Sequence, residues 1–150
     1  MNKDTQNKLE KIIQTKTILF VGIGNALKSD DGIGIYICNN IKQTNNIKTL
    51  IVENGIEKFV GKINSLNPEI LILVDCTDFN KKPGFVDILP IEQIQDFTVN
   101  THTISVKRIS EFFKMKTFIL GVQAENVRFG EEFSKGVINS ANELIKKINA

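Results

Sequence analysis

The feature that most constrains the fold is the alternation of short apolar runs with segments whose apolar residues recur every three or four positions. Five runs have the length and β-branched character of strands, and they cover residues 17–24, 49–54, 69–75, 85–90 and 117–122. Four segments have helical spacing, and they cover residues 31–41, 59–66, 106–113 and 133–148. Strands that alternate with helices are typical of a parallel sheet covered on both faces. We therefore expect an α/β protein, a three-layer α/β/α sandwich with a mostly parallel five-stranded sheet.

The run 85–90 differs from the other four. It follows Pro83-Gly84 and alternates apolar with polar residues, whereas runs such as 69–75 are continuously apolar. Alternation indicates a strand with one covered face, and a proline nearby is tolerated best at a sheet edge. We expect an edge strand here, open to antiparallel pairing.

Composition narrows the functional class and the location. The 150 residues fit one domain, and the 19 Lys and Arg are nearly balanced by 17 Asp and Glu and are scattered, so no nucleic-acid partner is indicated. Residues 1–16 lack the apolar centre of a signal peptide, and no run approaches the ~18 apolar residues that span a bilayer. Cys38 and Cys76 form no CxxC pair. We expect a single-domain, monomeric, cytoplasmic protein with no membrane insertion.

The loop that follows the first strand has the sequence GIGNALKSDDGIG, from Gly22 to Gly34. It begins like a dinucleotide-binding fingerprint, but Leu27 stands where the third glycine is needed. Asp30 and Asp31 also fall at the start of the expected helix, where they would repel a phosphate. The loop therefore argues against a nucleotide-sensing domain.

Three acidic or imidazole side chains follow strands or precede helices. Aspartate caps helices well, so Asp30 and Asp31 are both open to a capping role, with Asp30 the better cap and Asp31 left to project from the first turn. Asp75 ends a buried strand, where it either carries function or opens the turn that follows. His102, the only histidine, lies in NTHTIS before the expected helix 106–113. Together Asp31, Asp75 and His102 make an N/O ligand set that suits nickel or zinc and leaves coordination positions open.

At these residues the sequence resembles the nickel-iron hydrogenase maturation endopeptidases. The resemblance is carried by GIGNALKSDDGIG, by LVDCTDFNKKPG, and by NTHTIS with the later FILGVQAENVRFG. The last two pieces are similar to the branch that processes energy-converting, formate-hydrogenlyase-type hydrogenases. Members of the family carry either Glu or Asp at the position of Asp31.

The resemblance implies an endopeptidase that removes the C-terminal extension of a hydrogenase large-subunit precursor. It implies that Asp31, Asp75 and His102 bind nickel that arrives with the precursor, so that cleavage tests metal loading. Gly22, Gly24 and Asn25 would shape the first loop, and Asp78 is either a turn residue or a partner of His102. Nickel would polarise the scissile carbonyl or activate the attacking water, and the sequence leaves both open.

Two other functions use the same residues. A Cys/His hydrolase would use Cys76 and His102, but Cys76 directly follows Asp75, and neighbouring residues of a strand point to opposite faces. A non-enzymatic nickel-binding or chaperone domain would instead hold free nickel tightly. Cys38, on the first expected helix, is interpreted as a small core residue.

Overall fold

The computed structural model describes residues 1–53, 55–94, 108–130 and 132–150. The helices of the described chain are α1 (Lys3–Thr15), α2 (Ile33–Asn39), α3 (Val60–Leu66) and α5 (Lys135–Asn149). The strands are β1 (Ile18–Ile23), β2 (Ile47–Glu53), β3 (Ile70–Thr77), β4 (Val86–Pro90) and β5 (Lys116–Gln123). Short 3-10 turns are η1 (Ser29–Gly32), η2 (Ile56–Phe59), η3 (Ile91–Gln93) and η4 (Ser110–Phe112).

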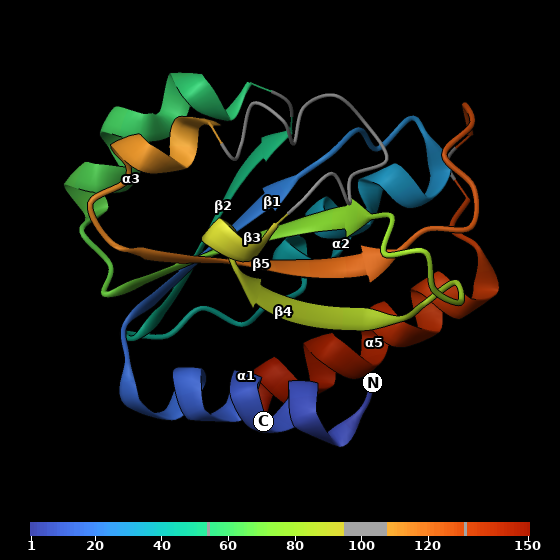
Figure 1. Ribbon diagram of the computed structural model, residues 1–150, viewed down its shortest axis with the longest axis horizontal. Coiled ribbons are helices and arrows are strands. Elements are labelled where there is room, and N and C mark those ends of the chain that lie inside the picture. Colours follow the sequence, from blue (N-terminus) through green and yellow to red (C-terminus); the bar gives the residue numbers. More distant parts are fainter. Residues whose placement is uncertain (54, 95–107, 131) are drawn as a thin grey trace.

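The five strands form one sheet in the order β2-β1-β3-β5-β4 (Figure 1). All neighbours are parallel except β4, which lies at the edge and pairs antiparallel with β5. The expected α/β class, the five strands and the edge position of residues 85–90 are confirmed. Strands β1 and β3 are direct neighbours, with Gly22 beside Val74, so their carboxyl ends lie at the same level.

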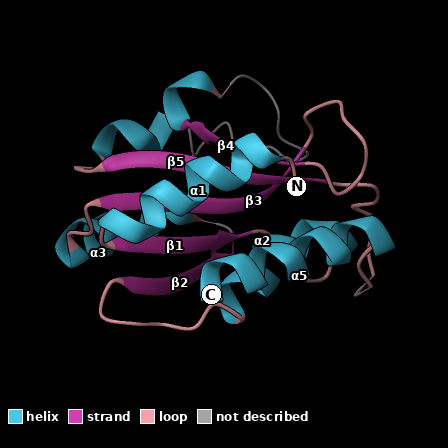
Figure 2. Ribbon diagram, turned by 90° about the horizontal axis from the view of Figure 1, so that it is seen from below, coloured by secondary structure: helices cyan, strands magenta, loops and turns pink. Residues whose placement is uncertain are grey.

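The two faces of the sheet pack into two separate cores. Ile72, Val74 and Cys76 of β3 join a cluster that includes side chains from α1, α2 and α5. Leu71 and Leu73 join the opposite cluster with Ile56, α3 and Phe113. Figure 2 shows α1, α2 and α5 over one face of the strands. The strict alternation along β3 determines which side each functional residue can face.

Helix α1 is absent from the sequence prediction. Its first turn is capped by the Asn2 side chain, whose Oδ1 accepts a hydrogen bond of 2.8 Å from the Thr5 amide. Leu9 is fully buried in the core, and Ile12 and Ile13 pack around it at helical spacing. These signals are present in the sequence, but the sequence analysis predicted no helix over residues 1–16.

Two expected helices differ from those observed. The segment 31–41 begins as the 3-10 turn η1, and the α-helix α2 occupies only Ile33–Asn39. Of the expected helix 106–113, residues 106 and 107 lie outside the described residues, and Ser110–Phe112 form η4. The helices expected at 59–66 and 133–148 are confirmed in α3 and α5. No helix in the described ranges is long and apolar enough to cross a membrane.

Candidate active site

The loop after β1 folds back onto the turn η1. The amide of Asn25 donates to both the main-chain oxygen of Asp31 at 3.3 Å and its side-chain Oδ2 at 3.1 Å. Gly24 has φ +140°, and a Cβ at this position would lie 2.0 Å from the Asp31 carbonyl oxygen. Only glycine allows this close approach, so Gly24 and Asn25 hold Asp31 over the end of β1.

Asp31 and Asp75 both lie at the carboxyl edge of the sheet and are both only 1% exposed. Asp75 lies two residues before the end of β3, and its Oδ1 accepts a hydrogen bond of 2.8 Å from the Cys76 amide. The turn η1 packs against β3. Neighbouring strands thus bring two buried carboxylates to one edge, where α/β sheets gather their ligands.

His102 lies outside the described residues, so the meeting of three ligands stays a prediction. Within the part of the chain that is described, no group of three His, Cys, Asp or Glu side chains is arranged to hold a metal ion. The donor chemistry of the two aspartates nevertheless fits nickel or zinc, because carboxylate oxygens bind both, and a single imidazole would complete an N/O set.

Asp30 does not cap a helix, and that interpretation is wrong. The residues at the N-cap positions are Lys28 for η1 and Gly32 for α2, and neither makes a side-chain capping bond. The Asp30 carboxylate is fully buried and accepts hydrogen bonds from the segment after β5. Its donors are the amides of Glu125, Asn126 and Ser134 and the Ser134 hydroxyl, at 2.9, 2.9, 2.7 and 2.8 Å.

The loop after β3 is organised by Gln123, which the sequence analysis missed. Its Oε1 accepts from the amides of Phe79 at 2.6 Å and Lys81 at 3.3 Å, and its Nε2 donates to Asp78 Oδ1 at 3.3 Å. Asp78 is exposed and also accepts from the Asn80 amide, so it is a turn residue. A buried glutamine at a strand end has no local sequence signal, because its partners are more than forty residues away.

Thr77 is a second residue that sequence reasoning did not single out. It lies two positions after Asp75 and therefore on the same face of β3. Its buried Oγ1 makes no hydrogen bond within the described chain. A buried hydroxyl without a partner is costly, and the Thr77 side chain packs with Phe79 over Gly121 of β5.

Cys76 is unsuited to nucleophilic attack. It packs in the core on the opposite face of β3 from Asp75 and is 1% exposed. Burial, together with the charges of Asp75 and Asp31, raises the pKa of the Cys76 thiol far above its usual range. Because the thiolate is the nucleophile, a thiol held protonated in the core disfavours the Cys76 and His102 hydrolase.

Comparison with known proteins gives one consistent result. A family model described as HycI, hydrogenase maturation protease, matches residues 35–150. A protein of Methanocaldococcus jannaschii, provisionally named a hydrogenase maturation protease, is 29% identical over 160 residues that cover 93% of this chain and 95% of that protein. The hydrogenase 3 maturation protease of Escherichia coli is 25% identical over 119 residues, which cover 75% of this chain and 76% of that protein.

A solved structure extends the agreement to three dimensions. The crystal structure of the nickel-iron hydrogenase maturation protease HycI from Thermococcus kodakarensis matches with a TM-score of 0.80 at 26% identity, covering 95% of this chain and 96% of that one. The family match includes Asp75 and the position of His102 and begins just after Asp31. The chain therefore belongs to the hydrogenase maturation protease family and is a hydrogenase maturation endopeptidase.

Proposed function

We propose that this endopeptidase removes the C-terminal extension of a nickel-iron hydrogenase large-subunit precursor after nickel has been inserted into that precursor. Asp31, Asp75 and His102 complete the coordination of the nickel that the precursor carries. The nickel is thus part of the substrate, and cleavage reports that loading is complete. We further propose that the protein works as a monomer in the cytoplasm.

The observation that carries the proposal is the pair Asp31 and Asp75, which are buried at the carboxyl ends of neighbouring strands. Burying two carboxylates at one edge of a sheet costs free energy, which the amides of Asn25 and Cys76 offset in part and a bound cation would offset further. The similar protein from Thermococcus kodakarensis is named for nickel-iron hydrogenase, which supplies the metal class. The related Escherichia coli protein is named a hydrogenase 3 maturation protease, which supports a hydrogenase precursor as the substrate.

The residues have distinct roles in this proposal. Asp31 and Asp75 supply negatively charged oxygen ligands that attract the nickel carried by the precursor, and His102 supplies the nitrogen ligand. The scissile peptide then lies beside the metal, where its carbonyl is polarised or a water is activated for attack.

The proposal is tested with nickel-loaded and nickel-free precursor. The unchanged protein should shorten only the loaded form. Asp31→Asn, Asp75→Asn and His102→Ala should each lower the cleavage rate by about a hundredfold or more, since even changes to groups that merely support metal ligands cost about 10- to 100-fold. Cleavage is followed by the mass of the precursor on a gel or in a mass spectrometer.

Asp4→Asn is the matched control, because it makes the same chemical change at an exposed helix position. Asp4 forms a surface ion pair with Lys8, 3.3 Å away, and such pairs contribute little. This variant should process the loaded precursor at the normal rate. Equal shortening of the loaded and nickel-free precursors would overturn the metal-sensing part of the proposal, and full activity of Asp31→Asn and Asp75→Asn would overturn the assignment of the site.

A further inference from the structure

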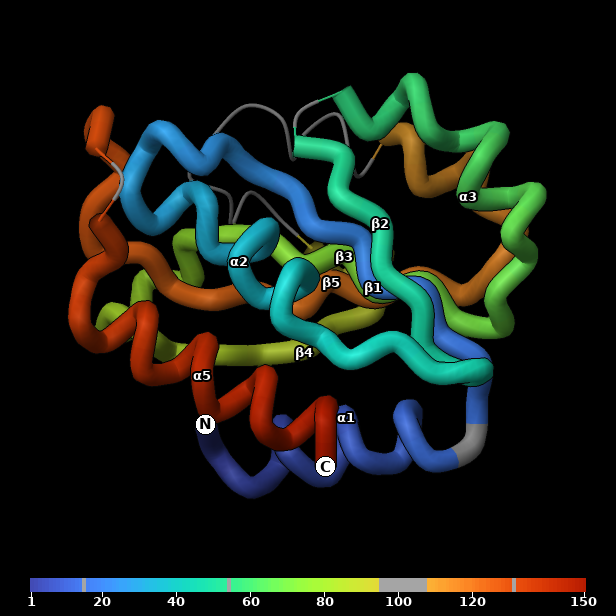
Figure 3. Tube along the Cα trace, turned by 180° about the vertical axis from the view of Figure 1, so that it is seen from behind, coloured from blue at the N-terminus to red at the C-terminus, as the bar shows by residue number. Residues whose placement is uncertain are grey.

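Three loops surround the candidate site at the carboxyl edge of the sheet. The first follows β1 and carries Asp31 in η1, the second follows β3 directly after Asp75, and the third runs from β5 to α5. Figure 3 shows the η1 loop beside the segment that follows β5, although the two are about a hundred residues apart in sequence. Because these loops carry or border Asp31 and Asp75, the contacts that join the loops bear on how the two carboxylates are placed.

The first and third loops are joined through Asp30. Besides the four bonds that its carboxylate accepts, the Asp30 amide donates to the Asn126 oxygen at 3.0 Å. Around it, Lys28 and Gly130 form a parallel bridge, with Ser29 donating to the Gly130 oxygen at 2.6 Å. The Asp30 carboxylate is thus fully buried, and its four hydrogen bonds among the described residues come from the neighbouring loop and from Ser134, which precedes α5.

The second and third loops are joined through Gln123. Its side chain holds the amides of Phe79 and Lys81 and the Asp78 carboxylate, as described above. Its Nε2 also donates to the Ala124 oxygen at 3.1 Å, and the Ala124 amide donates to the Thr77 oxygen at 3.2 Å. Gln123 therefore connects the end of β3, which carries Asp75, to the same segment that Asp30 binds.

We propose that Asp30 and Gln123 are positioning residues that together set the separation of Asp31 and Asp75 through the shared segment 123–126. This inference rests on the proposed function, because it assigns the two residues to the geometry of that site. Asp30 contacts no substrate in this account and acts through Asp31. Fixing reacting groups in a productive geometry matters strongly, since a displacement of about 1 Å can cost about a hundredfold in rate.

The chemistry of both side chains is directional. In Asp30→Asn one oxygen becomes an NH2 group that faces N–H donors, so at least one hydrogen bond is replaced by a repulsive donor pair. In Gln123→Glu the donor toward Asp78 and Ala124 becomes an acceptor, while the two bonds from Phe79 and Lys81 are retained. Both substitutions keep the size of the side chain and alter the contacts between the loops; Asp30→Asn also removes a negative charge, and Gln123→Glu adds one beside Asp78.

The test measures kcat and KM for cleavage of nickel-loaded precursor. Asp30→Asn and Gln123→Glu should lower kcat by about 10- to 100-fold while KM changes by less than about threefold. Ser134→Ala removes only the hydroxyl bond to Asp30 and keeps the three amide donors, so it should fold normally and lower kcat by a smaller factor, and Ser134→Thr should restore it. Hydrogen exchange at the amides of Glu125 and Asn126 should be faster in both Asp30→Asn and Ser134→Ala.

The double variant Asp30→Asn/Gln123→Glu provides the sharpest result. If Asp30 and Gln123 both set the distance between Asp31 and Asp75, the fold-loss of kcat in the double variant should be clearly smaller than the product of the two single fold-losses. Thr5→Val is the control, because it removes one bond of a buried side chain, from Thr5 Oγ1 to Asp87 Oδ1, in the α1 layer. It should lower stability without changing kcat per folded molecule.

The failures of the two proposals are distinguishable. If Asp31→Asn and Asp75→Asn abolish cleavage while folded Gln123→Glu and Ser134→Ala keep normal kcat, the positioning role is wrong and the proposed function stands. If Asp30→Asn and Gln123→Glu lose only the folded fraction, with kcat per folded molecule unchanged, Asp30 and Gln123 are structural alone. If Asp31→Asn and Asp75→Asn cleave normally, the proposed site itself is wrong.

Discussion

Asp30 and Asp31 are adjacent in sequence and almost fully buried, but their carboxylates accept hydrogen bonds from different parts of the chain. Asp31 accepts from Asn25 in its own loop, whereas Asp30 accepts from residues 125, 126 and 134. An acidic pair at the start of a helix therefore divides into a residue that presents a carboxylate and a residue that anchors the turn. The sequence predicted the division but assigned the wrong task to Asp30, because helix capping is the only role that local spacing can reveal.

The buried thiol of Cys38 leads to a prediction about how the stability of the protein depends on pH. Burial raises the pKa of Cys38 well above its usual range, so the thiol stays protonated in the folded protein. In the unfolded chain it ionises near pH 8.5, so its stabilising contribution is complete below that pH and is lost as pH rises. Between pH 9 and 10 the free energy of unfolding should fall by about 1 kcal/mol for this thiol.

Urea denaturation of the unchanged protein and of Cys38→Ala at pH 7, 9 and 10 isolates the contribution of this thiol. All other ionisable groups are present in both proteins, so their contributions cancel in the comparison. The stability difference between the two should stay constant below about pH 8 and narrow above it. Curves that remain parallel up to pH 10 would contradict an ionisable, buried Cys38.

At the scale of elements, the helix α2 depends on close packing against two strand ends. A Cβ on Gly34 would lie 2.2 Å from the Val74 oxygen and 2.7 Å from the Ile23 oxygen. Both contacts are with main-chain atoms, which cannot rotate away. The glycine therefore allows α2 to begin directly against β1 and β3, and η1 with Asp31 precedes it.

Gly34→Ala should destabilise the protein by about 1–3 kcal/mol, the usual range for an overpacked core. It should also lower the cleavage rate, because α2 would shift and carry η1 with it. Gly61→Ala is the matched control, since a Cβ there meets no atom within 4 Å and the residue lies in helix α3. That variant should be stabilised by about 0.5–1 kcal/mol. Thermal unfolding of both proteins compares them directly, and equal midpoints would be inconsistent with the close packing of α2.

The elements differ in how well the sequence predicts them. The buried strands β1, β3 and β5 were predicted because continuous β-branched runs have few alternative structures. The start of α2 was misjudged because residues 29–32 form a 3-10 turn, whose short-range bonds leave no periodic signal. The bonds of Asp30 and Gln123 could not be predicted, because their partners come together only after the strands have assembled in the order of the sheet.

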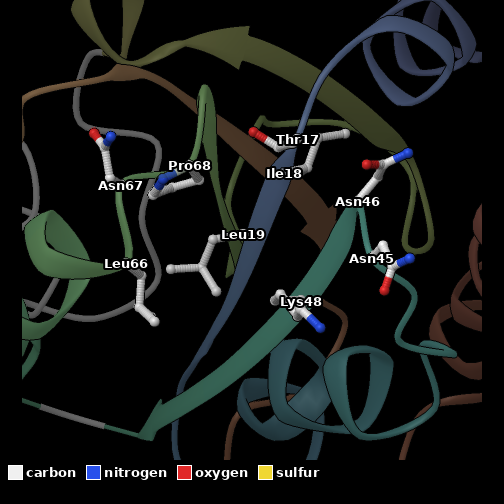
Figure 4. A pocket seen from close by; sticks show the side chains of 9 residues that line it. All are labelled: Thr17, Ile18, Leu19, Asn45, Asn46, Lys48, Leu66, Asn67 and Pro68. Atoms are coloured by element: carbon white, nitrogen blue, oxygen red, sulfur yellow. The ribbon is translucent and has the colours of Figure 1, made fainter.

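At the scale of the whole molecule, the two ends of the sheet have different properties. The carboxyl ends carry Asp31, Asp75 and the three joined loops. The amino ends border a pocket of about 260 Å³ that includes Thr17, Asn46 and Pro68 (Figure 4). A six-residue strand such as β1 spans about 20 Å, so the pocket and the candidate site are on opposite sides of the molecule.

This polarity predicts where substitutions will matter. In parallel sheets the carboxyl ends bring together loops and helix starts, whereas the amino ends mainly support the fold. Asn45→Ala and Lys48→Ala change exposed residues that line the amino-end pocket. Both variants should cleave nickel-loaded precursor with kcat/KM within about twofold of normal, because surface substitutions away from a site have small effects.

The comparison is decisive because the proposed substrate is a protein subunit, which can dock over a wider surface than the cleaved peptide alone. If docking used the amino end, removing the Lys48 charge and the Asn45 amide would raise KM while leaving kcat unchanged. A tenfold rise in KM for either folded variant would therefore place part of the substrate on that side. Unchanged KM in both, together with the loss of kcat in Asp31→Asn, would confine the working surface to the carboxyl edge.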